Sequence, residues 1–357
     1  MTDARLSPQN EAHISTHGAI FSPGTTRELI NFSTHSGDTE RFHHDWSAVT
    51  AYVQRLGLDG LELLLGYEAP PVLPPGLVQA VHLPFWLTWF DIWRGRPAIV
   101  AGSDEFIRWT YGGRTADELI AGQQQVWQHA ARLDPAYMVF HVSHIEPAHT
   151  FTRAFSYTSA EVCQATAELL NAVVATFPHG EPPARLALEN LWWPGLTFID
   201  NTAEQLAEQL HFDNWAFVLD TGHLLNTCPT LTDEAQAIGY VLATIERLPT
   251  DIRARIECVH LNLSLSGHYQ QAALLEGLPA GFAAMDTPAQ YHCARLHAAQ
   301  IDQHVAFSSP RCGDILAALK PRFVTHEFLS RDQAEFDAKL TMQRAALRAW
   351  HVRTLAY

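Results

Sequence analysis

The segment Trp215–His223 reads WAFVLDTGH and shows a pattern that recurs along the chain. Its apolar run, Trp215–Leu219, has the length and the aromatic and aliphatic side chains of a buried strand. Asp220 and His223 follow at once, and carboxylate and imidazole groups are common metal ligands. The segment therefore predicts a buried strand that ends in a candidate metal site.

Similar apolar runs recur on both sides of this segment, and amphipathic stretches lie between them. The expected strands are Glu28–Phe32, Leu58–Leu65, Val78–Leu83, Tyr137–Val142, Arg185–Leu188, Trp215–Leu219, Ile256–Leu261 and Arg322–Thr325. Apolar residues at three- and four-residue spacing predict helices at Trp46–Leu56, Ala116–Leu133, Ser159–Phe177, Ala203–Leu210, Asp233–Leu248 and Asp332–Trp350. Eight strands that alternate with helices favour an α/β fold, a closed (β/α)8 TIM barrel, over a doubly wound sheet.

Two connections exceed the ~2–6 residues that are usual between a strand and the next helix. One follows the third expected strand, and the other follows the seventh, from about Asn262 to Gln300. In a barrel, both insertions would rise over the mouth of the active site. We find no repeat, low-complexity tract or linker, so we expect a single barrel domain over residues 26–357. Residues 1–25 are expected to form an N-terminal arm.

Composition limits the partners. The formal net charge is −15, and the only lysines are Lys320 and Lys339, so we expect no nucleic-acid partner, which a basic surface would bind. No stretch approaches the ~20 apolar residues of a membrane helix. We therefore expect a small-molecule substrate and no membrane association. The oligomeric state is left open.

The five cysteines are odd in number and never spaced as CxxC, which is typical of reduced thiols. Residues 1–22 are polar and lack the apolar core of a signal peptide. Both observations lead us to expect a cytoplasmic protein.

A metal-ligand side chain stands at nearly every expected strand end from the third strand onward. These candidate ligands are His82, His141, Glu189, Asp220, His223, His260, Asp302, His304 and Glu327. Strand ends of a barrel converge on one small volume, where several carboxylates would be destabilising unless cations neutralised them. Imidazole together with carboxylate suits zinc, manganese or iron better than calcium or magnesium. We therefore expect divalent metal ions, although a polar barrel mouth without metal is the plain alternative.

The order of these nine residues resembles the endonuclease IV branch (AP endonuclease family 2) of the xylose-isomerase-like TIM barrels. The most specific pieces are LEN at Leu188–Asn190, DTGH at Asp220–His223, HLN at His260–Asn262 and DxH at Asp302–His304. The resemblance implies two or three metal ions per chain, with zinc first and manganese or iron as alternatives. It implies one ion at His82, His141 and Glu189; a second at Glu189, Asp220, His260 and Glu327; and a third at His223, Asp302 and His304.

A multinuclear cluster can lower the pKa of a bridging water from about 15.7 towards ~7 and stabilise both oxygens of a phosphoryl displacement. We therefore predict a metal-dependent hydrolase of a phosphate ester or phosphodiester in a small metabolite, in which Glu189 positions the hydroxide. The same fold hosts sugar or sugar-phosphate isomerases and epimerases that use one metal, with Glu189 and Glu327 transferring the proton. The additional ligands favour the multinuclear hydrolase. A multinuclear iron enzyme and a non-catalytic metal-binding protein remain alternatives.

Aromatic residues follow the third and fifth expected strands. Trp86, Trp89 and Trp93 either line a substrate pocket or form a packed lid that touches only protein. The same two alternatives hold for Trp192 and Trp193. We also place Asn190 and Asn262 beside the pocket, where they could orient the ligands.

Overall fold

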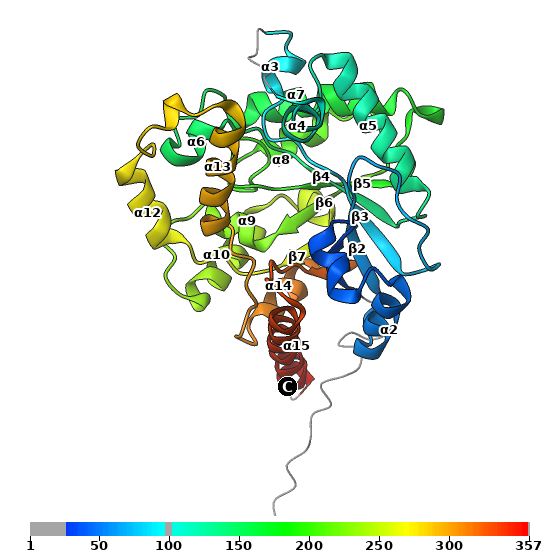
Figure 1. The fold of residues 1–357 in the computed structure, drawn as a ribbon. Helices are drawn as coiled ribbons and strands as arrows, with labels where there is room; N and C mark the ends of the chain where they lie inside the picture. The colour runs from blue at the N-terminus through cyan, green and yellow to red at the C-terminus, as the bar shows by residue number, and fades with distance from the viewer. Residues whose placement is uncertain (1–25, 97–101, 356–357) are drawn as a thin grey trace, which may run out of the picture.

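The computed structural model describes residues 26–96 and 102–355, and the strands in this part of the chain close into a parallel barrel (Figure 1). Each strand pairs with the next, and the first pairs with the last. The strands are β1 (Arg27–Ser33), β2 (Gly60–Leu64), β3 (Val78–His82), β4 (Tyr137–His141), β5 (Arg185–Glu189), β6 (Trp215–Asp220), β7 (Ile256–Leu261) and β8 (Phe323–His326). Each lies within two residues of an expected strand, so the predicted (β/α)8 barrel is confirmed. The expected arm, residues 1–25, lies outside the described residues.

Helices surround the barrel, and the six expected ones are present. They are α2 (Trp46–Leu56), α5 (Ala116–Ala131), α7 (Ser159–Val174), α8 (Thr202–Gln209), α10 (Glu234–Arg247) and α15 (Gln333–Leu355). Local sequence sets their ends: Thr158 and Glu161 form a capping box at the start of α7, and α2 stops at Gly57, which has φ 66°. Two shorter helices, α11 (Thr250–Ala254) and α14 (Cys312–Leu319), were not expected.

The alternation of strands and helices fails between β2 and β3. Residues 65–77 of the described chain contain no helix. Pro70, Pro71, Pro74 and Pro75 fall in this segment, and proline removes a backbone donor and disfavours helical geometry in the residue before it. The connection therefore runs as a loop at the rim of the barrel.

The two long connections hold additional helices. α3 (Phe90–Trp93) and α4 (Asp104–Tyr111) lie between β3 and α5, and α12 (Gly267–Glu276), η3 (Phe282–Ala284) and α13 (Thr287–Ile301) lie between β7 and α14. In addition, α12 and α13 pack on α6 (Pro147–Thr152), which follows β4 (Figure 1). Short helices α1 (Ser36–Thr39), η1 (Glu40–Phe42), η2 (Pro178–Gly180) and α9 (Thr221–Asn226) complete the described elements.

The interior of the barrel holds a separate small core. It contains two residues of β4, one residue of each other strand except β2, and no residue of β2: Leu29, Ala80, Tyr137, Val139, Ala187, Val218, Cys258 and Phe323. Successive side chains on a strand point to opposite faces. The next inward position along most of these strands is therefore the one at the carboxyl end, where the expected ligands stand.

None of the helices in the described residues is long and apolar enough to cross a membrane. All five cysteines are free thiols, and three of them are buried.

Candidate metal centre

The two-residue period of the strands brings candidate ligands to the rim of the barrel. His82 lies two residues after the inward-facing Ala80, and His141 lies two residues after Val139. The same spacing places Glu189, Asp220 and His260 two residues after Ala187, Val218 and Cys258. Register completes the arrangement, because His141 pairs with Glu189 and Asp220 pairs with His260 on neighbouring strands.

The nine candidate ligands form three groups, and the first two share Glu189. Within each group the nitrogen and oxygen atoms all lie within 4.8 Å of one another. We call them group 1 (His82, His141 and Glu189), group 2 (Glu189, Asp220, His260 and Glu327) and group 3 (His223, Asp302 and His304). These sets are the ones that the resemblance implied.

In group 1, Oε2 of Glu189 lies 3.1 Å from Nε2 of His141 and 3.3 Å from Nε2 of His82. The two imidazole nitrogens are 3.0 Å apart. Nδ1 of His82 lies 2.9 Å from the carbonyl of Leu83 and donates to it, so Nε2 of His82 carries the lone pair. Nε2 of His82, Nε2 of His141 and Oε2 of Glu189 therefore face a common centre.

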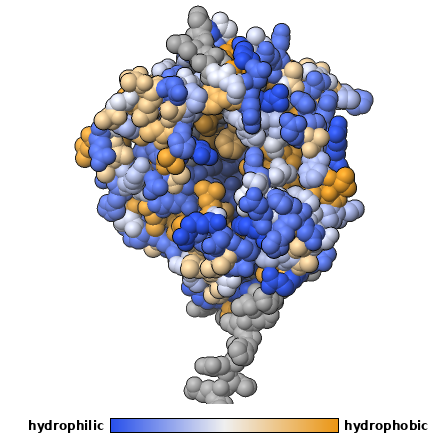
Figure 2. Space-filling model, viewed as in Figure 1, coloured by the Kyte–Doolittle hydropathy of each residue, from blue (hydrophilic) through white to orange (hydrophobic). Residues whose placement is uncertain are grey.

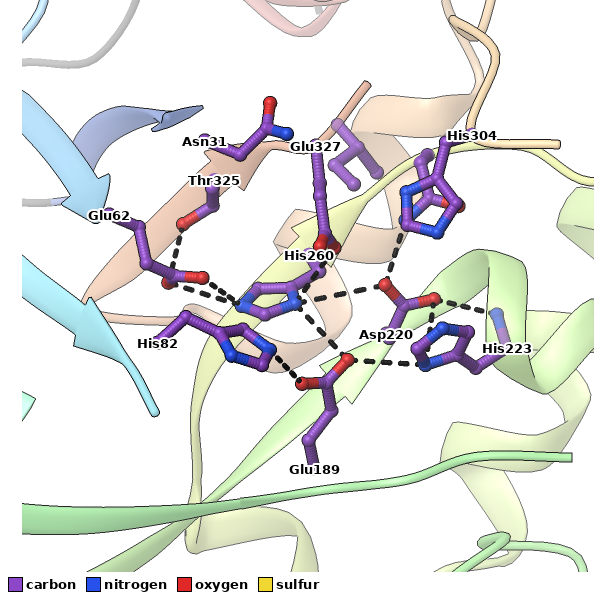
Figure 3. A network of polar contacts seen from close by, with 12 residues as sticks. Asn31, Glu62, His82, Glu189, Asp220, His223, His260, His304, Thr325 and Glu327 are labelled. Carbon is purple, nitrogen blue, oxygen red and sulfur yellow. Dashed lines mark hydrogen bonds and ion pairs between the residues drawn. The ribbon is translucent and has the colours of Figure 1, made fainter. Parts of the chain in front are cut away.

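In group 2, Nδ1 of His260 lies 2.9 Å from Glu327 Oε2, 3.3 Å from Glu189 Oε1 and 3.7 Å from Asp220 Oδ2. Figure 3 shows the Glu189, Asp220 and Glu327 carboxylates turned towards this ring. The two oxygens of Glu189 thus face different groups: Oε2 faces group 1, and Oε1 faces group 2.

Group 3 is assembled from α9 and the end of the long connection after β7. The Asp220 side chain accepts a hydrogen bond from the His223 backbone at the start of α9 and so fixes His223. A backbone bridge between Leu263 and Val305 ties the connection to the segment after β7. As a result, Asp302 Oδ2 lies 2.8 Å from Nε2 of His304 and 3.3 Å from Nε2 of His223.

Several atoms of these groups are buried without a hydrogen-bond partner in the described residues. They include both carboxylate oxygens of Glu189, Nδ1 of His260 and Oε2 of Glu327. Nδ1 of His260 lies 3.3 Å from Glu189 Oε1 and 2.9 Å from Glu327 Oε2. These distances are close to the roughly 3.3–3.6 Å that separates two ligand atoms of one tetrahedral zinc ion. Unpartnered buried polar atoms are costly, and a cation in group 1 together with one in group 2 would satisfy these atoms. The donor set, nitrogen and oxygen without sulfur, therefore fits zinc, manganese or iron.

Burial and mutual repulsion set the protonation of the carboxylates. Burial raises the pKa of Asp220 to about 7, where His223 opposes the shift and Glu327 and Glu189 add to it. Burial also acts to raise the pKa of Glu189, but His141 and His260 hold that pKa well below its usual range. Charged carboxylates at this depth thus need positive neighbours, which is the condition under which such a site binds divalent cations.

The two asparagines support Asp220 and do not line an open pocket. Asn190 and Asn262 are both fully buried. Nδ2 of Asn262 donates to Asp220 Oδ2 at 2.8 Å, and Asn190 exchanges two hydrogen bonds with the Asp220 backbone. Nδ1 of His223 donates to the Asn190 carbonyl at 2.9 Å, which leaves Nε2 to face group 3.

The predicted aromatic residues take different positions. Trp192 lies beside group 3, with its ring centroid 5.1 Å from that of His223. Trp193 is buried in a cluster with Ile145, Leu191 and Ile301, and Trp93 donates to Glu168 on α7. Trp86 and Trp89 are also buried; Trp89 donates to the Ser143 carbonyl, and Trp86 packs against Gly112. Trp86, Trp89, Trp93 and Trp193 are therefore packed against other parts of the protein, whereas Trp192 lies beside the candidate ligands.

Sequence reasoning missed Phe85, whose ring stacks on His141 at a centroid distance of 4.3 Å and remains 38% exposed. It also missed Glu62 and Glu28, two buried carboxylates of β2 and β1. Each is an acidic residue within an apolar strand, which is the signal that could have identified it.

A cavity of about 770 Å³ lies at the same rim of the barrel, and none of the nine ligands lines it. Its walls come from the segments after β1 and β2 and from α4, and include His35, Tyr67, Arg108 and Trp109. The backbone nitrogen of Leu65, which also lines it, donates to the carbonyl of His82. The cavity wall therefore borders the end of β3, the strand that carries His82. Figure 2 shows a hollow with a hydrophilic floor near the middle of one face of the molecule.

Comparison with known proteins gives likeness in fold. No family model matches the chain, and no curated protein matches it in sequence. Among solved structures, endonuclease IV from Thermus thermophilus is 17% identical, with a TM-score of 0.49 over 90% of this chain and 99% of that one. An L-ribulose 3-epimerase is 15% identical, with a TM-score of 0.47 over 93% of this chain and 97% of that one. Identities this low concern the fold alone.

Proposed function

We propose that the chain is a metal-dependent hydrolase that cleaves a phosphate ester or phosphodiester in a small metabolite. The observation that carries the proposal is the sharing of Glu189: one carboxylate contributes an oxygen to group 1 and the other oxygen to group 2. Cations held in this way would supply Lewis acidity to a phosphoryl group and would acidify a water molecule.

The chain itself would orient and shield the reacting phosphoryl group. Group 3 adjoins the other two groups, because Nδ1 of His223 lies 3.1 Å from Glu189 Oε1. A phosphoryl group at this point could thus be contacted from all three groups at once. Phe85 and Trp192, which lie against ligand histidines of groups 1 and 3, would limit the access of bulk water.

The shape of the rim favours a small metabolite over a polymer. The cavity is large enough for the part of a substrate that does not react, and its wall carries one positive charge, Arg108, beside the carboxylates of Glu68 and Glu105. The net charge of −15 opposes binding of a polyanion such as DNA.

A sugar isomerase or epimerase is the second candidate, because group 2 by itself is a complete site for one metal that includes two glutamates. In that reaction Glu189 and Glu327 would exchange a proton with a carbon atom next to a carbonyl. Both oxygens of Glu189, however, already face histidines. That engagement favours the hydrolase.

The test combines a metal count with two isotope experiments on the purified full chain. Mass spectrometry of the metals should find two or three ions per chain. Turnover of bis(p-nitrophenyl) phosphate in H₂¹⁸O should place ¹⁸O in the phosphorylated product, and the Glu189→Gln variant should lose this activity. Ketohexoses and their phosphates incubated in D₂O should gain no deuterium.

Two other outcomes would overturn the hydrolase. One metal per chain together with deuterium in a sugar would establish the epimerase. Two or three metals without turnover of phosphodiesters, phosphomonoesters or sugars would leave a metal-binding protein without hydrolase activity.

A further inference from the structure

Glu62 is a buried carboxylate of β2 that lies below the ligand groups, inside the barrel. Its Oε1 lies 2.9 Å from Nε2 of His260. Its Oε2 accepts a hydrogen bond from the Tyr137 hydroxyl at 2.6 Å and another from the Thr325 hydroxyl at 3.0 Å. Figure 3 shows Glu62 and Thr325 on the side of His260 that faces away from Asp220 and Glu189.

This contact fixes which nitrogen of His260 carries hydrogen. An ionised carboxylate only accepts hydrogen bonds, so Nε2 of His260 must be the donor. Nδ1 then holds the lone pair, and it is this atom that faces Glu189, Asp220 and Glu327 without a hydrogen-bond partner. His82 and His223 are also held by one ring nitrogen, but there Nδ1 donates to a backbone carbonyl and Nε2 faces the ligands, whereas in His260 Nε2 contacts a carboxylate and Nδ1 faces the ligands.

A second buried pair shows that the contact alone does not make a metal ligand. Glu28 Oε1 lies 2.8 Å from Nε2 of His326, which resembles the pairing of Glu62 with His260. Nδ1 of His326, however, lies 2.7 Å from the side-chain amide of Gln343, and Arg344 also contacts Glu28. Both nitrogens of His326 are therefore used by the protein, whereas one nitrogen of His260 is directed at group 2.

Tyr137 and Thr325 restrain Glu62 in turn. Both hydroxyls contact Oε2, and the Tyr137 ring belongs to the small core inside the barrel. The carboxylate therefore has defined partners for both oxygens and is held at the depth where Oε1 meets His260. A carboxylate in this position orients a metal-binding histidine and makes it more basic.

We propose that Glu62 is a positioning residue of the metal centre: it holds His260 with hydrogen on Nε2, so that Nδ1 is presented to a cation in group 2. The inference rests on the metal-binding part of the proposed function and does not depend on which reaction is catalysed.

The experiment measures zinc affinity of the full chain by competition with a chromophoric chelator, so that turnover is not needed. Glu62→Gln keeps the size of the side chain but removes its charge, and we expect one of the bound ions to dissociate about 10–100-fold more readily. Tyr137→Phe, which removes one of the two hydroxyl hydrogen bonds to Oε2 of Glu62, should give a smaller loss in the same site. Glu28→Gln is the matched control, because it alters the similar pair at His326; it should lower stability and leave zinc affinity unchanged.

Two-bond ¹H–¹⁵N spectra of the imidazoles report which ring nitrogen carries hydrogen, which a purely structural role of Glu62 would not change. We expect hydrogen on Nε2 of His260 in the native protein and altered His260 signals in Glu62→Gln. If Glu62→Gln fails to fold, Tyr137→Phe and Thr325→Val decide the question in the same assays. Native zinc affinity in the soluble Glu62 or Tyr137 variants would overturn this inference and leave the hydrolase intact. A native chain that binds no zinc, manganese or iron would overturn both.

Discussion

Oε2 of Glu189 lies 3.1 Å from Nε2 of His141, the residue opposite it in the register of β4 and β5. The other oxygen, Oε1, lies 3.3 Å from Nδ1 of His260 on β7. One fully buried carboxylate thus joins ligands from distant parts of the barrel. Loss of the Glu189 charge should therefore weaken metal binding in groups 1 and 2 together, whereas loss of a ligand that belongs to a single group should weaken metal binding in that group only.

We expect Glu189→Gln to lower the metal content by up to two ions per chain and turnover by at least about 100-fold, because its two oxygens serve groups 1 and 2. Metal analysis and kcat on bis(p-nitrophenyl) phosphate measure the two effects. Glu168→Gln, which alters a partly exposed glutamate on α7, is the control and should change neither. A Glu189→Gln chain with its full complement of metal would contradict the shared role.

His304→Ala should remove one ion and leave the others, because His304 contributes to group 3 alone. Its Nε2 lies 2.8 Å from Asp302, so the loss should spread no further than that group. Metal analysis after dialysis measures the change, and the exposed His268→Ala on α12 provides the comparison. Loss of every ion in His304→Ala would show that the groups do not fill separately.

Removal of metal should destabilise the protein, because the carboxylates of Glu189 and Asp220 are fully buried and close to one another. A ligand at 1,000 times its Kd contributes about 4 kcal/mol to the free energy of unfolding. We expect a chelator to lower Tm by at least about 5 °C, and added zinc to restore it. The same chelator saturated with zinc beforehand is the control. An unchanged Tm in a chain shown to be metal-free would count against a metal centre.

Phe85→Ala should raise KM by about 10-fold while metal content and Tm stay near native values. The ring stacks on His141 but is 38% exposed, so its removal uncovers the site without opening the core. Steady-state kinetics give KM and kcat separately. Val352→Ala, at an exposed position of α15, should leave both constants unchanged. A loss of metal in Phe85→Ala would instead indicate a structural role at His141.

Arg108→Gln should weaken binding of anionic substrates, because Arg108 lines the cavity at the rim of the barrel. We expect KM to rise by about 10-fold for a bulky phosphodiester and to change less for p-nitrophenyl phosphate, which lacks the second ester group that the cavity would hold. Arg114→Gln removes an exposed pair with Asp104 and serves as the control for charge. Equal effects on both substrates would show that the cavity does not hold the larger one.

The barrel and most candidate ligands could be predicted because both depend on short segments, whereas the division of the ligands into three groups was implied by the family resemblance. A buried strand such as Trp215–Asp220 has a local apolar pattern, and its last inward residue reaches the rim whatever the rest of the chain does. The ligand types are equally local, since carboxylate and imidazole are metal ligands in any context. Convergence of the strand ends follows from the barrel itself.

The aromatic residues and the supporting network could not be predicted in this way. Trp93 and Trp192 are both tryptophans in a segment that follows a predicted strand. In the structure, however, Trp93 donates to Glu168, whereas Trp192 lies beside His223. Side-chain direction in a long connection depends on the helices that pack around it, which no local pattern specifies.

The order of residues along the chain was enough to predict that strands ending in His, Asp and Glu form a barrel with candidate ligands at its rim. The folded chain was needed to show which nitrogen of His260 faces those ligands, because Glu62 lies 198 residues away in the chain. The register of the strands explains why the sequence did not suffice. Closure of the barrel decides which inward side chains lie at the same level, and the contact between Glu62 and His260 therefore depends on the register of every strand from β2 to β7.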